Sequence, residues 1–113
     1  MKINSVPSFK AEFNKNNYSN AIFLKNAYFD AKESGRVSDF KDAKKIIKNS
    51  YLADGNINVI KTSPQKDVFK IESSMLSTPI EVTVLKKQNS KTEFLDSFLG
   101  FAKLMKQTFG VED

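Results

Sequence analysis

Histidine and cysteine are both absent from this chain of 113 residues. Without cysteine there can be no disulfides, thiolate nucleophiles, thiolate zinc sites or iron–sulfur ligands. Without histidine, the chain lacks the commonest general base near neutral pH and the commonest metal ligand of proteins. Triad and zinc chemistry are therefore excluded. We expect no catalytic residue, no metal and no cofactor, and an enzyme that uses carboxylates, lysines or hydroxyls is the least favoured alternative.

Glycine and long apolar runs are also scarce. The chain has only four glycines, so it contains neither a phosphate-binding glycine loop nor a dinucleotide fingerprint. No window approaches the roughly 18 consecutive apolar residues of a membrane span, and "MKINSVPSFKAEF" lacks the apolar region of a signal peptide. We therefore expect a cytoplasmic protein that does not bind a membrane, and the lack of cysteine fits a reducing compartment.

The composition is that of a folded protein. Hydrophobic residues make up 40% of the chain and charged residues 27%, which is close to the average for globular proteins. A chain of this length has room for one hydrophobic core, so residues 1–113 are predicted to form a single domain.

Lysine supplies nearly all of the positive charge. The net charge is +5, and Arg36 is the one arginine among eighteen basic residues. A basic balance suggests an anionic partner such as nucleic acid. Recognition of bases and phosphates favours the planar fork of arginine, however, and an AT-rich genome encodes lysine by default. Compositional bias is therefore the favoured explanation of the charge.

Four lysines share one face of a predicted helix at spacings of three and four: Lys41, Lys44, Lys45 and Lys48. This row is the candidate anion or nucleic-acid patch, because such a face is able to follow a line of phosphates. Lysine rows without interleaved aromatic residues are common on solvated helices, so a plain solvent-exposed face is the favoured interpretation. A lysine-driven nucleic-acid-binding protein remains the alternative function.

The first half of the chain predicts a strand followed by two helices. Phe9, Ala11 and Phe13 alternate with polar residues, as in a strand with one buried face. A helical period begins at Ser19 and should end at Gly35, which is a natural left-handed cap. The next helix should have Ser38 as its N-cap, with Asp39 and Asp42 in its first turn.

The second half predicts three strands and a last helix. The strand-like runs are "NINVIKT", "DVFKIES" and "PIEVTVLK", and the short connections between them favour an antiparallel meander. Ser90 and Glu93 have the spacing of a capping box that begins the last helix. The fold class is therefore α+β in the order β-αα-βββ-α, with an antiparallel sheet of three or four strands packed against helices.

Two positions on the first helix lie outside its core face. Ile22 and Phe29 are seven residues apart and form a second apolar stripe. Cover by another part of the same domain is the favoured interpretation, and a dimer or partner interface is the alternative. On the last helix, Gly100 and Leu104 lie away from the phenylalanine-rich face, and Gly100 suggests either a kink or the close approach of a neighbouring element. These four residues are the candidate partner interface.

By elimination, the sequence favours a small non-enzymatic protein that binds another macromolecule. A protein partner or self-association is preferred over nucleic acid.

Overall fold

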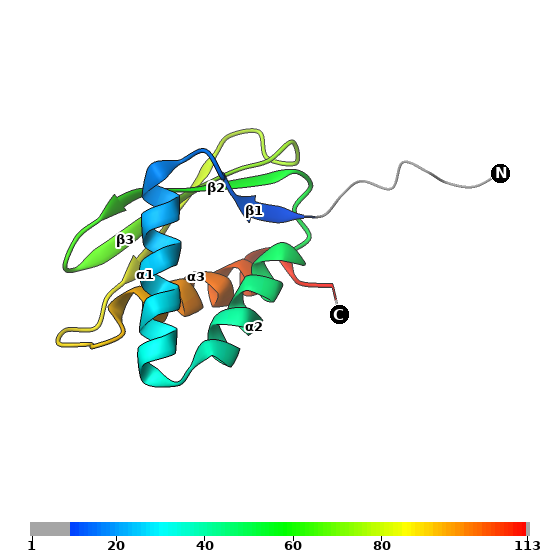
Figure 1. Cartoon of the computed structure of the whole chain (residues 1–113). Coiled ribbons are helices and arrows are strands. Elements are labelled where there is room, and N and C mark those ends of the chain that lie inside the picture. Colours follow the sequence, from blue (N-terminus) through cyan, green and yellow to red (C-terminus); the bar gives the residue numbers. More distant parts are fainter. Residues whose placement is uncertain (1–9, 113) are drawn as a thin grey trace.

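A computed structural model describes residues 10–112 and confirms the α+β class and the predicted order of elements (Figure 1). Phe9, which is predicted to face the core from the first strand, lies outside the described residues. The elements are β1 (Ala11–Phe13), α1 (Tyr18–Ser34), α2 (Val37–Lys48), β2 (Gly55–Thr62), β3 (Lys66–Glu72), β4 (Ile80–Leu85) and α3 (Glu93–Phe109).

The four strands form one sheet in the order β1-β2-β3-β4. β2, β3 and β4 pair antiparallel, as their short connections predict. β1, however, pairs parallel to β2, with Ala11 opposite Gly55, so the prediction of a purely antiparallel sheet is wrong. The reason is the connection between them: the chain passes through both α1 and α2 before β2 begins, which is long enough for a parallel crossover.

The helices cover one face of the sheet (Figure 1). Aromatic rings are prominent in the core between the two layers. Phe69 of β3 stacks on Phe101 of α3 with ring centroids 4.2 Å apart, and Phe40 of α2 stacks on Phe98 at 5.0 Å. The phenylalanine-rich face of α3 is therefore the spine of the core. On the other face of the sheet, Leu85 is exposed to solvent.

The two helices after β1 form the expected hairpin. α1 ends at Gly35, whose φ of 71° is the left-handed conformation that glycine adopts without strain. α2 begins at Val37, so Ser38 is already inside the helix and the prediction that it is the N-cap is wrong. In the first turn of α2, Asp39 Oδ2 accepts a hydrogen bond from Arg36 Nε at 3.0 Å. This hydrogen bond is the main reason that the pKa of Arg36 is raised above its ordinary value.

The capping box predicted for α3 is also wrong, because this helix receives its cap from another helix. α3 begins at Glu93, and its N-cap is Thr92 rather than Ser90. Ser90 Oγ accepts from Thr92 N at 3.1 Å and donates to Asp96 Oδ2 at 2.7 Å. The cap comes from α1: Asp30 Oδ2 accepts hydrogen bonds from the amides of Phe94 at 2.9 Å and Leu95 at 3.2 Å. A carboxylate at this end also complements the helix dipole.

Removing this cap gives a first testable expectation. Asp30→Ala should lower the free energy of unfolding by about 1 kcal/mol, as for the loss of an ordinary N-cap. Asp30→Asn should retain part of that stability, because an amide oxygen still accepts the hydrogen bonds. Urea denaturation would measure both, with Asp42→Ala, an exposed aspartate on α2, as the control. Equal stability of Asp30→Ala and the Asp42 control would contradict the assignment.

The core also contains one buried ion pair. Lys86 Nζ, after β4, lies 3.3 Å from Asp67 Oδ1 of β3, and both side chains are almost fully buried. The same ammonium group is 3.8 Å from Glu93 and lies 5.0 Å from the ring centroid of Phe94. Within the described part of the chain, neither carboxylate oxygen of Asp67 has a hydrogen bond of good geometry. The charge of Lys86 is therefore the main compensation for this buried carboxylate.

Candidate protein interface on helix α1

Helix α1 has apolar residues on two faces, but only one face is covered. Phe23, Ala27 and Ala31 are buried against the other helices and the sheet. On the opposite side, Ile22 is 42% exposed and Phe29 is 59% exposed. The prediction that another part of the domain covers these two residues is therefore wrong for the part of the chain that the structure describes.

Four exposed residues lie along this side of α1, and we call them the α1 strip. Tyr18, at 78%, is the most exposed of its large side chains, and Glu33 closes the strip at the other end. Spacings of four and seven residues place all members on one side of a helix. They are Tyr18, Ile22, Phe29 and Glu33. At 1.5 Å of rise per residue the strip is about 22 Å long, so it is an extended exposed patch of the kind that marks protein interaction sites.

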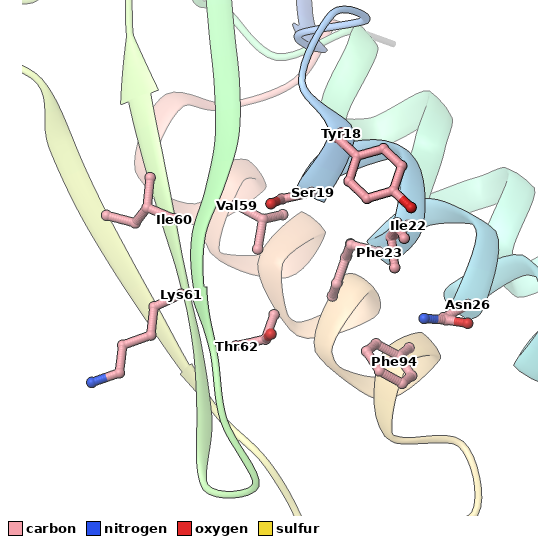
Figure 2. A pocket seen from close by; sticks show the side chains of 10 residues that line it. All are labelled: Tyr18, Ser19, Ile22, Phe23, Asn26, Val59, Ile60, Lys61, Thr62 and Phe94. Atoms are coloured by element: carbon pink, nitrogen blue, oxygen red, sulfur yellow. The ribbon is translucent and has the colours of Figure 1, made fainter.

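A pocket lies beside one end of the strip, between α1 and β2. It has a volume of about 290 Å³. Figure 2 shows Phe23 of α1 directed towards β2, where Val59 forms the opposite wall, and Ile22 and Phe94 also line this α1–β2 pocket. The end of the strip that holds Ile22 is therefore continuous with a recess able to take a side chain from a bound protein.

A β-bulge shapes the sheet side of this pocket. The register between β2 and β3 shifts between Val59 and Lys61, which leaves Ile60 as an inserted residue. In Figure 2 the side chains of Ile60 and Lys61 point away from the helix layer. Because side chains alternate along a regular strand, Lys61 would face the helix layer without the inserted residue, so the β-bulge turns this side chain away from α1.

A buried asparagine fixes the position of α1 beside β2. The Asn20 side-chain amide donates to Ile57 O and Asn14 O, each at 3.0 Å, and its oxygen accepts from Val59 N at 2.7 Å. Asn20 is 1% exposed, so these bonds lie in the core. The side chain pairs with the edge of β2 where β1 has turned away. Sequence reasoning missed this residue, although its position three before Phe23 placed it on the buried face.

The other two residues of the predicted interface lie elsewhere. A Cβ added at Gly100 would sit 3.0 Å from Val84 Cγ1 of β4, so a neighbouring element does approach this glycine closely. Leu104 is half-buried against the core. Neither residue lines the α1–β2 pocket. Ile22 and Phe29 are therefore the members of the predicted set that are open to a partner.

The lysine row is divided between two surroundings. Lys41, Lys44, Lys45 and Lys48 are all exposed on α2. Lys44 and Lys48 border a groove between α2 and β1, whereas Lys41 and Lys45 do not. Exposure of all four side chains agrees with the favoured interpretation of a solvated helix face, and nucleic-acid binding stays an untested alternative.

Searches for other site types among residues 10–112 found no group of three or more acidic residues arranged to hold a metal ion. In the same range, no helix is both long and apolar enough to cross a membrane. Comparisons with family models, with curated proteins and with solved structures gave no match.

Proposed function

We propose that this chain is a non-enzymatic protein-binding module of the cytosol, and that the α1 strip is its binding surface. The observation that carries the proposal is the exposure of Ile22 and Phe29 on a helix whose core face is already complete. Large apolar side chains in an extended band lose solvent contact when another protein covers them, and this burial favours association. The adjoining α1–β2 pocket supplies the concave element that anchor side chains need.

The partner we put forward is a second copy of the same chain. The strip has spacings of four, seven and four residues, so the spacing is symmetric about the middle of the strip. An antiparallel copy related by a two-fold axis near Lys25 therefore places Ile22 against Phe29 of the second copy. The same axis places Tyr18 against Glu33, where the phenol can donate to the carboxylate. Such a self-complementary surface is what a two-fold dimer requires.

Size-exclusion chromatography with light scattering tests the pairing. The chain should elute with twice its mass of 12.8 kDa at high protein concentration, and Phe29→Glu should return it to 12.8 kDa. Four carboxylates would then crowd the interface, which we expect to raise the dissociation constant at least tenfold. Because Phe29 is exposed in the single chain, the variant should unfold at the same temperature as the unchanged chain when both are dilute enough to be monomeric. A chain that is monomeric at every concentration would contradict self-association.

The absence of cysteine permits a sharper version of this test. Ile22→Cys and Phe29→Cys variants, mixed under oxidation, should form a disulfide between chains because the geometry brings these positions together. A mixture of Ile22→Cys with Lys45→Cys, which lies on another helix, serves as the matched control. Equal cross-linking in the two mixtures would contradict the antiparallel arrangement even if a dimer forms.

A further inference from the structure

The groove between β1 and α2 has an apolar floor to which β1 and all three helices contribute. Ile47 and Phe40 of α2, Phe98 of α3 and Leu24 of α1 form this floor, together with Phe13 of β1. Phe13 and Leu24 are only half-buried, so they present apolar surface to the groove. The stacking of Phe40 on Phe98 at 5.0 Å makes the floor rigid and preformed.

The rim of the same groove carries mostly positive charge. Lys44 and Lys48 stand on the α2 side, one helical turn apart, and Lys15 stands on the β1 side. Glu12 is the one carboxylate at this rim. In the described part of the chain, none of the three lysines forms an ion pair. The rim thus has unneutralised positive charge directly above an apolar floor.

The size of the groove decides which kind of ligand it suits. Its volume is about 390 Å³, which lies within the range of small-molecule sites, roughly 300 to 1,000 Å³. A protein partner would require a surface of about 800 Å² on each side. The groove by itself therefore fits a small molecule better than a protein segment.

We propose that the β1–α2 groove binds an anionic amphiphile with a single apolar chain. The chain lies on the aromatic floor, and the charged head group pairs with Lys44, Lys48 and Lys15 at the rim. A carboxylate and a phosphate head group share this chemistry, because lysine recognises both as a point charge. This inference is independent of the α1 strip, because none of the strip residues lines the groove. It gives Lys44 and Lys48, but not Lys41 and Lys45, a role in binding.

Titration calorimetry of the full chain with four ligands of equal chain length tests the proposal. The ligands are dodecanoate, dodecyl phosphate, dodecanol and dodecylamine, each used below its micelle-forming concentration or, for the alcohol, below its solubility limit. At least one of the two anions should bind tenfold more tightly than the alcohol, and the amine should bind most weakly. Comparing the two anions identifies the preferred head group. Equal binding of the anions and the alcohol would overturn the proposal.

The lysine row supplies a matched pair of variants for the same titration. Lys44→Ala with Lys48→Ala should weaken binding of the preferred anion about tenfold, equivalent to 1.4 kcal/mol. Lys41→Ala with Lys45→Ala removes the same charge from the same helix, away from the groove, and should change the affinity less than twofold. All four side chains are exposed, so folding should survive in both variants. Equal weakening by the two pairs, or amide chemical-shift changes confined to residues outside the groove, would overturn the assignment.

Discussion

Replacing Lys86 by methionine will lower the free energy of unfolding by about 3–5 kcal/mol, which is the loss expected when one partner of a buried ion pair is removed. The Asp67 carboxylate is fully buried, and its oxygens have no good hydrogen bond to compensate for the missing ammonium group. Methionine fills a similar volume, so the loss reports the uncompensated charge rather than a cavity. Chemical denaturation at neutral pH would measure the change.

A double replacement separates the charge from the packing. Lys86→Met combined with Asp67→Leu removes both charges, so it should recover most of the stability that the single change loses. The neighbouring Lys87→Met is the matched control, because Lys87 is exposed. We expect that control to stay within about 0.5 kcal/mol of the unchanged protein. A double variant no more stable than Lys86→Met alone would show that packing, and not charge, dominates at this site.

The second large effect is expected at Asn20, whose replacement by leucine should lower the free energy of unfolding by about 3 kcal/mol. Leucine has the same branching and the same number of side-chain heavy atoms as asparagine but offers no polar atom, so the amide of Val59 loses its acceptor in the core. An unpaired buried polar group costs about 1–3 kcal/mol. The loss of the bonds to Ile57 O and Asn14 O adds to that penalty.

Two further variants locate this effect in the side-chain amide. Asn20→Asp keeps an acceptor for Val59 N but replaces the donor, so it should also be destabilised. Asn16→Ala alters an exposed asparagine in the preceding turn and should have little effect. Hydrogen exchange provides a local readout, since the Val59 amide should exchange much faster in Asn20→Leu. Unchanged protection of that amide would contradict the role given to Asn20.

Local sequence patterns predicted the elements of this fold because those patterns arise from neighbouring residues. The alternation of Ile80, Val82 and Val84 defined β4, and Gly35 marked the end of α1. Both signals depend on backbone geometry within a few residues. The α+β class followed from the order of such segments alone.

Features that depend on distant residues could not be predicted in this way. The direction of β1 relative to β2 depends on the path of the two helices between them. The cap of α3 comes from Asp30, more than sixty residues earlier in the chain. A capping box at Ser90 was a plausible local solution, but a tertiary contact replaced it. The burial of Asp67 could not be predicted from the sequence either, because its partner Lys86 lies on a different segment.

The candidate interface could likewise be predicted only in the part that depends on local sequence. Helical spacing identified Ile22 and Phe29 as a second apolar face, but spacing does not reveal whether another element covers that face. The small residues Ala27 and Ala31 let the neighbouring helices pack on the other side of α1, which leaves the strip exposed. The groove beside Lys44 was not predicted either, because it arises where α2 and β1 meet.

The parallel pairing of β1 has a consequence during protein synthesis. β1 leaves the ribosome before its partner strand, because residues 14–54 must be made before β2 begins. The nascent chain therefore carries an unpaired strand while both helices form, and exposed strand edges are prone to associate with other chains. A strand of three residues limits that risk, since it offers few backbone groups to a wrong partner. The shortness of β1 thus fits a strand that is synthesised well before the strand with which it pairs.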